Sequence, residues 1–255
     1  KNYNNKADGR ITVMLGPHAP YTCPPEYLET VVAISKDLKA EIHIHLAETL
    51  FEVGECQKQY GKSPIELMEA TGILQRGVLA AHCVHLSDND ISLMKKYNVR
   101  VAHNPGSNMK LASGIAPVHK MLQAGLCVGL GTDGASSNNN LDMLEELRLA
   151  TLLHKVNTLD PLVVPAYEGV LMATKYGAEA VGLKDTVGIL AEGYKADITL
   201  FDTNNLWWTP QNDKISLLAY SANSSQVDTV IVNGKILMNK GQLLTMDEEK
   251  ILYEV

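Results

Sequence analysis

Short apolar runs alternate with longer amphipathic stretches from Arg10 to about Thr186. A turn rich in polar or glycine residues follows each run, and the runs cover residues 11–15, 41–46, 77–81, 100–103 and 126–130. Strands that alternate with helices of about 10–15 residues indicate βαβ units and a parallel sheet. We therefore predict an α/β unit over residues 1–186, with five parallel strands and helices between them.

Two of the amphipathic stretches carry helix signals. Thr22 is the expected N-cap of the first, since a hydroxyl can accept a hydrogen bond from the first turn, which Pro24 and Pro25 suit. The asparagines at 138–140 are the expected cap of the second. The apolar positions recur at helical spacing: Leu28, Val31 and Leu38 in the first stretch, and Leu141, Leu144 and Leu147 in the second.

The pattern changes after residue 186. Residues 196–201 alternate like a half-buried strand, and residues 230–237 resemble a β-hairpin, because Asn233-Gly234 readily adopts the positive φ angles of a tight turn. We predict that residues 187–255 form a small β domain, separate from the sheet of residues 1–186.

Composition and charge exclude several classes of protein. With 45% hydrophobic residues, the 255-residue chain can bury a sizeable core. A net charge of −7 without any basic run argues against nucleic acid as a partner. No apolar stretch reaches the roughly 18 residues of a membrane helix, and the polar residues 1–10 do not resemble a signal peptide. The four cysteines form no C-x-x-C pair, so we expect reduced thiols, a cytoplasmic protein and no membrane partner.

Residues capable of chemistry recur where the predicted strands end. In a parallel sheet these points share the edge at which α/β active sites lie. Several imidazoles and carboxylates meeting there would suit a divalent metal such as Zn²⁺, which lowers the pKa of a bound water while a nearby carboxylate moves protons. The residues, in strand order, are His18; His45 and Glu48; His82 and His85; His103 and Asn104; and Asp133.

The histidines of the second run form an H-x-H pair. On a strand, His43 and His45 share one face and lie about 6.6 Å apart. Both rings can therefore serve as metal ligands, while His43, the deeper of the two, can equally be a packing residue; spacing does not choose between these roles. Dinucleotide-binding, P-loop and G-x-S-x-G motifs are all missing from the sequence.

The number of parallel strands limits the architecture. Five strands cannot close a barrel, whereas eight βα units usually need about 250 residues. An open sheet would leave two hydrogen-bonding edges. The chain therefore forms either an open doubly wound sheet or a barrel from which the first units are missing.

Five ordered motifs resemble the amidohydrolase superfamily, and within it the 5′-methylthioadenosine/S-adenosylhomocysteine deaminases. A closing segment, VGILAEGYKAD at 187–197, is similar to the point where such enzymes enter their β-sandwich. The motifs are GPHAPYT at 16–22, HLAET at 45–49, AHCVHL at 81–86, HNPGSN at 103–108 and GTDGASSN at 131–138.

The resemblance implies a metal-dependent (β/α)₈ TIM-type barrel, of which this chain holds strands 4–8, together with the C-terminal part of a small β-sandwich. It implies that His45 and Asp133 bind one divalent metal ion per subunit, expected to be zinc, and that His43 does not. Glu48 would contact the adenine ring and protonate N1, His82 would polarise the attacking water, and His18 would contact the substrate. Asp133 would also remove a proton from that water.

The remaining histidines are assigned no chemistry. We expect His85 and His103 to be structural, and His119 and His154 lie in helical stretches. The family's first H-x-H, and the glutamate and arginines that hold the ribose, are missing from this sequence. We therefore expect a C-terminal portion of a longer polypeptide, or a chain whose other strands belong to a separate one.

The expected function is metal-dependent hydrolytic deamination of an adenosine-type nucleoside to its inosine analogue and ammonia. Two alternatives remain open. A related enzyme could act on guanine, another heterocycle or a triazine chloride, or an incomplete barrel could serve as a non-catalytic binding subunit. The resemblance also implies a homo-oligomer with a small-molecule nucleoside as its partner.

Overall fold

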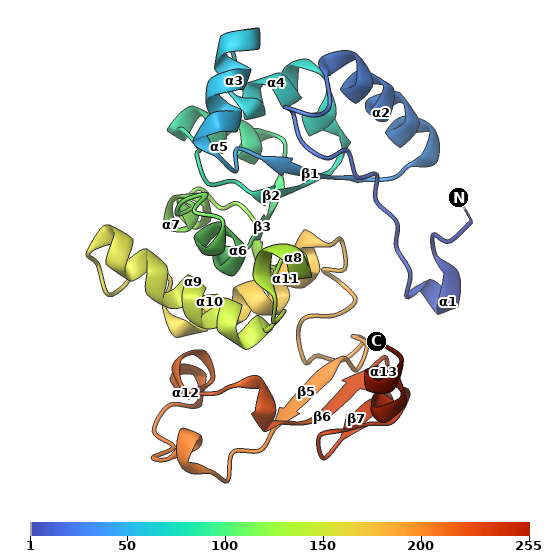
Figure 1. The fold of residues 1–255 in the computed structure, drawn as a ribbon, viewed down its shortest axis with the longest axis vertical. Helices are drawn as coiled ribbons and strands as arrows, with labels where there is room; N and C mark the ends of the chain where they lie inside the picture. The colour runs from blue at the N-terminus through green and yellow to red at the C-terminus, as the bar shows by residue number, and fades with distance from the viewer. Residues whose placement is uncertain (1) are drawn as a thin grey trace.

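A computed structural model describes residues 2–255, which form two sheets with helices around them (Figure 1). The first sheet is parallel, with its strands in chain order, and the second is antiparallel. The parallel strands are β1 (Ile42–Leu46), β2 (Val78–His82), β3 (Arg100–His103) and β4 (Val128–Leu130). The antiparallel strands are β5 (Ile198–Phe201), β6 (Val227–Val232), β7 (Lys235–Asn239) and β8 (Gln242–Leu243).

The burial of β1 shows how the parallel sheet presents its side chains. Ile42, Ile44 and Leu46 are buried against the helices, whereas His43 is exposed and His45 half-buried on the other face. The parallel register pairs Leu46 with His82. His45, which directly precedes Leu46, therefore lies at nearly the same level of the sheet as His82 on the neighbouring strand.

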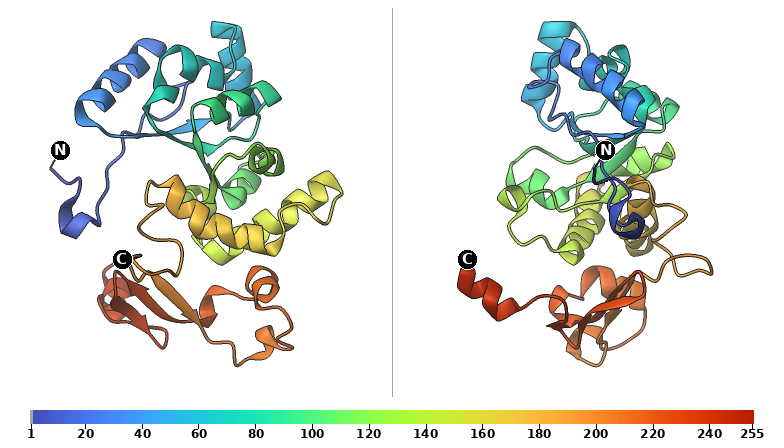
Figure 2. Two further views of the ribbon diagram at one scale, coloured as in Figure 1. Left: turned by 180° about the vertical axis from the view of Figure 1, so that it is seen from behind. Right: turned by 90° about the vertical axis from the view of Figure 1, so that its right-hand side faces the viewer.

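Helices cover the apolar face of the parallel sheet, and Figure 2 shows them from two further sides. The longest are α2 (Pro25–Leu38), α3 (Leu50–Tyr60) and α9 (Met143–Thr158). Shorter helices occur throughout the chain, and α1, α12 and α13 lie away from the parallel sheet (Figure 1). They are α1 (Lys6–Gly9), α4 (Pro64–Ala70), α5 (Asp88–Lys96), α6 (Pro105–Lys110), α7 (Val118–Gln123), α8 (Ala135–Asn138), α10 (Ala166–Ala173), α11 (Lys175–Ala180), α12 (Lys214–Tyr220) and α13 (Glu248–Glu254), with 3₁₀ turns at Ile73–Arg76, Leu206–Trp208 and Ser224–Gln226.

Four of the five predicted parallel strands are confirmed, and the first is wrong as a full strand. Residues 11–15 form only an isolated bridge between Leu15 and Ile42, although they lie beside β1. The Leu15 amide donates to the Glu41 carbonyl at 2.8 Å. This segment lies at the edge of the sheet, and Ile11 and Val13 are exposed there, so burial does not enforce a regular ladder.

Both predicted helix caps are wrong, although both helices exist. Helix α2 begins at Pro25 with Pro24 at the N-cap, and the Thr22 hydroxyl instead bonds to Nδ1 of His18. Helix α9 is capped by Asp142, whose carboxylate accepts from the amides of Leu144 and Glu145. A carboxylate nearer the helix thus replaces the predicted asparagines, which precede it.

The predicted hairpin is confirmed in the second sheet. Strands β6 and β7 are joined by Asn233 and Gly234, which have φ angles of 50° and 76°. These positive angles are those of the tight turn that Asn-Gly favours. The boundary between residues 186 and 187 stays a prediction. Within residues 2–255, no helix combines the length and apolar character needed to cross a membrane.

Candidate active site

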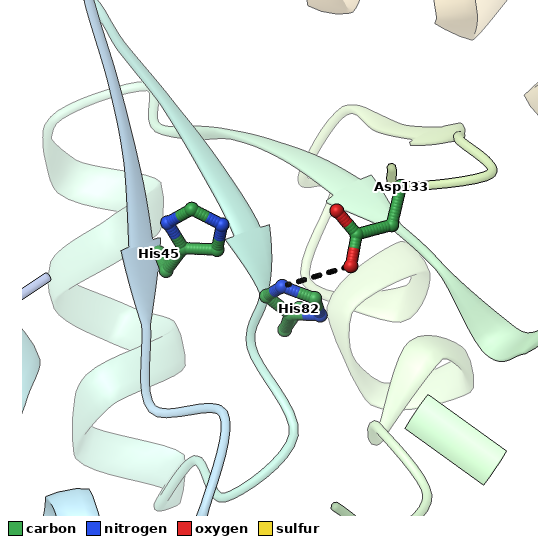
Figure 3. A group of neighbouring side chains, drawn as sticks. All are labelled: His45, His82 and Asp133. Atoms are coloured by element: carbon green, nitrogen blue, oxygen red, sulfur yellow. Dashed lines mark ion pairs between the residues drawn. The ribbon is translucent and has the colours of Figure 1, made fainter. Parts of the chain in front are cut away.

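Three side chains meet at the carboxyl edge of the parallel sheet (Figure 3). His45 lies near the end of β1, His82 ends β2, and Asp133 lies in the loop after β4. Their ligand atoms all lie within 4.8 Å of one another. The rings of His45 and His82 are stacked, with centroids 5.2 Å apart. Residues from three strands, separated by up to 88 positions in the chain, thus form one group.

The backbone turns sharply at each of these strand ends. Ala47, His82 and Asp133 have φ angles of 52°, 71° and 63°, in the left-handed region that residues other than glycine seldom adopt. Each such residue costs about 1–2 kcal/mol. Strain of this kind persists where the surrounding structure enforces it, and three of the positions that carry it lie at the candidate site.

Hydrogen bonds determine which ring nitrogen each histidine presents. Nδ1 of His45 donates to the His18 carbonyl at 2.8 Å, and Nδ1 of His82 donates to Oδ1 of Asn108 at 2.8 Å. Carbonyl oxygens only accept, so Nδ1 carries the proton in both rings. Nε2 is therefore the nitrogen that each ring presents to the site.

Asp133 is held as an ionised carboxylate. Oδ2 accepts from the hydroxyls of Ser107 and Ser137, each at 2.7 Å, and Oδ1 accepts from the Gly134 amide at 2.7 Å. Burial by itself raises the pKa of Asp133, but the hydrogen bonds from Ser137, Ser107 and Gly134 outweigh it and bring that pKa below its usual value. Asp133 therefore presents a negative charge to its neighbours at neutral pH.

Glu48 faces the same group from the turn after β1. Its Oε1 accepts from the Ser113 hydroxyl at 3.0 Å, and its Oε2 lies 3.7 Å from Nε2 of His82. That nitrogen also lies 4.0 Å from Oδ2 of Asp133. Nε2 of the buried His82 ring thus faces carboxyl oxygens of both Glu48 and Asp133.

The donor set fits a divalent metal. Two imidazole nitrogens and a carboxylate oxygen are ligands that zinc takes in catalytic sites. Metal-binding histidines usually donate their other ring N–H to a carbonyl or carboxylate, as His45 does to the His18 carbonyl. His45, His82 and Asp133 are thus able to hold such an ion, and no other group of this kind occurs among residues 2–255.

The other predicted residues are distributed around this group. His18 is exposed, with its ring centroid 5.1 Å from that of His45. His43 lies on the same strand face but outside the metal-type group. Nε2 of His85 donates to the Ser113 carbonyl at 2.7 Å, so this histidine supports the residue that bonds Glu48.

Sequence reasoning missed the residues that orient the site. Ser107, Asn108 and Ser137 stand inside the quoted motifs, yet nothing in their spacing assigned them to His82 or Asp133. Ser137 follows Asp133 by four positions and lies in α8, which begins two residues after Asp133; this is the one local signal of contact. The bond from Ser113 to Glu48 joins residues 65 positions apart and has no such signal.

The fold and this site define the class of protein. The model of the amidohydrolase family matches residues 2–237, and the chain belongs to that family. The four parallel strands and the small antiparallel sheet fit a partial barrel with an added sheet, as predicted.

The most similar sequences carry a more specific name. A 5-methylthioadenosine/S-adenosylhomocysteine deaminase of Pelotomaculum thermopropionicum is 57% identical over 254 residues, which cover 100% of this chain and 58% of that protein. The chain therefore spans less than two thirds of the length of such relatives.

Two solved structures have the same arrangement. An adenosine deaminase from Xanthomonas campestris with bound zinc matches with a TM-score of 0.94 and 33% identity, covering 98% of this chain and 57% of that one. An atrazine chlorohydrolase from Arthrobacter aurescens TC1, complexed with zinc, matches with a TM-score of 0.88 and 30% identity, covering 96% and 54%.

Proposed function

We propose that this protein hydrolytically deaminates an adenosine-type nucleoside, such as 5′-methylthioadenosine, S-adenosylhomocysteine or adenosine, to the inosine analogue and ammonia. The observation that carries the proposal is the contact of His82 with both Glu48 and Asp133 at the strand ends. The names of the relatives support the adenosine-type substrate.

His45 and Asp133 would hold one divalent metal ion, for which zinc is our candidate because the similar structures contain it. When bound, the metal acts as a Lewis acid that lowers the pKa of water. The proton on Nδ1 of His45 leaves its Nε2 free for such an ion. His82 belongs to the same group, and we assign it to the attacking water instead.

The chain's own residues move the protons. Asp133, ionised through its three hydrogen bonds, accepts a proton from the water that attacks C6 of the purine. His82 lies between the two carboxylates and stabilises the negative charge that develops on the oxygen at C6. Glu48 protonates N1, so that charge does not accumulate on the ring, and it regains a proton from the hydroxyl at C6 as that group becomes a carbonyl. The proton held by Asp133 then leaves with the amine as ammonia, while exposed His18 contacts the substrate.

The test replaces Glu48 by Gln in the full-length protein. The variant keeps the shape of the side chain but has no acidic proton, so we expect kcat to fall by about 10²–10⁴-fold, with metal content unchanged by elemental analysis. Glu55→Gln is the matched control, since that carboxylate lies on α3 and forms its ion pair with Lys58, at 3.5 Å. Near-normal turnover of Glu48→Gln with metal still bound would remove this role from Glu48.

Another hydrolysis on the same scaffold is the second candidate, and the similarity to the chlorohydrolase favours it. A panel of 5′-methylthioadenosine, S-adenosylhomocysteine, adenosine, guanine and atrazine separates the candidates. We expect ammonia from the adenosine-type compounds. Chloride from atrazine, or ammonia from guanine alone, would replace the proposal, and a metal-free protein without turnover would favour a binding role.

We also propose the setting in which the protein acts. The net charge of −7 supports a protein without a nucleic acid partner. We further propose that the protein is a cytoplasmic homo-oligomer and does not associate with membranes. We also propose that a domain boundary lies between residues 186 and 187. Sedimentation of the purified protein tests the oligomer, and a monomer across the micromolar range would contradict it.

A further inference from the structure

A buried carboxylate lies behind Glu48 and is not part of the reaction described above. Glu52 is in the first turn of α3 and is only 1% exposed. Its Oε1 accepts from the Ala47 amide at 2.8 Å, and its Oε2 accepts from the Glu48 amide at 2.9 Å. One carboxylate thus holds two consecutive backbone amides of the turn that carries Glu48.

This arrangement differs from ordinary helix capping. Thr49 caps α3 by accepting from the Glu52 amide at 3.1 Å, and the spacing of Thr49 and Glu52 is that of a capping box. In such a box the glutamate would return a bond to the amide of the N-cap residue. Here the amide of Thr49, the N-cap residue, interacts only weakly with Glu52, and the two hydrogen bonds go to the two residues before it, so the glutamate ties the helix to the end of β1.

We propose that Glu52 is a positioning residue, which fixes the backbone of the Ala47–Glu48 turn so that the Glu48 side chain is directed at the substrate. The inference rests on the proposed function, since it assigns Glu48 the role of proton donor. The side chain of Glu48 is held separately by the Ser113 hydroxyl. Glu48 is therefore anchored at its backbone and at its carboxylate by different residues.

The chemistry of the two amides explains why a carboxylate occupies this position. Both N–H groups need an acceptor. An ionised carboxylate offers two oxygens, whereas a side-chain amide offers one oxygen and an NH2 group, which only donates. Burial raises the pKa of Glu52, and the bonds from Glu48 and Ala47 oppose that increase. Because Ala47 is in the left-handed region, with φ of 52°, the turn needs such support to keep its shape.

The experiment compares Glu52→Gln with Glu55→Gln in the full-length protein. Glu55 is on the same helix, and its substitution removes the same charge without touching the turn. We expect Glu52→Gln to lower kcat for 5′-methylthioadenosine by about 100-fold, the effect of misplacing a reacting group by about 1 Å. We expect KM and metal content to change little, and Glu55→Gln to behave like the unchanged protein. Unchanged kcat in Glu52→Gln, or an equal loss in Glu55→Gln, would overturn the inference.

Amide hydrogen exchange gives a readout that does not depend on turnover. We expect the Ala47 and Glu48 amides to exchange about tenfold faster in Glu52→Gln, the equivalent of one lost hydrogen bond. If that variant does not fold, the unchanged protein decides the matter, since unprotected Ala47 and Glu48 amides would overturn the inference. A protein without deaminase activity but with both amides protected by Glu52 would refute the proposed function alone.

Discussion

Acid is expected to destabilise this protein through a buried histidine pair. His103 on β3 and His154 on α9 are both 0% exposed, and their Nε2 atoms lie 3.2 Å apart. One ring donates this bond to the other, and burial, which lowers the pKa of both rings, keeps the pair neutral. Among the described residues, neither Nδ1 has a hydrogen-bond partner. A further proton would therefore create a buried charge that nothing nearby neutralises.

The magnitude follows from the pKa of His154. Burial, followed by the nearby charges of His119 and Lys155, lowers this pKa from 6.5 to about 4. Burial, His154 and His82 hold the pKa of His103 well below its usual value as well. The unfolded chain thus binds more protons than the folded one between pH 6.5 and pH 4, so stability is retained above pH 6.5 and decreases as the pH falls through this window. For His154 the full loss is about 3 kcal/mol, of which about 2 kcal/mol has occurred at pH 5.

The assay is urea unfolding at pH 7 and pH 5 on the full-length protein and on His154→Gln, which cannot titrate in this range. We expect the unchanged protein to lose about 2 kcal/mol more than the variant over that interval. His18→Gln is the control, because that histidine is exposed. An equal pH dependence in the unchanged protein and His154→Gln would refute the reasoning.

Two further substitutions probe the supports of the site. In Gly106→Ala the new Cβ would overlap the Glu146 carboxylate and lie 2.9 Å from Nδ2 of Asn138. We therefore expect the free energy of unfolding in urea to fall by about 1–3 kcal/mol. A fall of less than about 0.5 kcal/mol would show that the neighbouring side chains move aside without cost. For the metal, we expect a chelator to lower the unfolding free energy of the full-length protein by about 2.7 kcal/mol relative to protein with zinc at 100 times its Kd. Asp133→Asn should show no such difference, and an equal response to chelator would exclude Asp133 as a ligand.

The sequence was most informative where burial on one face imposes a pattern. The alternation in β1 placed His45 at the strand's end, and the order of motifs brought His82 and Asp133 to the same edge. The five-run pattern failed at residues 11–15, because an apolar run at a sheet edge need not form a ladder. Apolar periodicity indicates which residues are buried, but it does not indicate how many neighbouring strands a segment pairs with.

The supporting residues were beyond sequence reasoning because their bonds join distant positions. Asn108 reaches His82 across 26 residues, and Ser113 reaches Glu48 across 65. Helix caps failed for a local reason, since Asp142 competes with the asparagines before it and a carboxylate next to the first turn is the better acceptor. Residue type alone does not determine which of several neighbouring polar side chains caps a helix.

The left-handed backbone at the strand ends also limits how this site can vary. A glycine would relax Ala47, His82 or Asp133, each of which adopts a φ angle between 52° and 71°. At His82 and Asp133 the same change would remove a side chain that the site requires. Ala47 has no polar group to lose, so glycine there would release conformational energy while leaving the neighbouring Glu48 less constrained. A substitution at position 47 would thus exchange rigidity of the Ala47–Glu48 turn for lower backbone strain, without altering His45, His82 or Asp133.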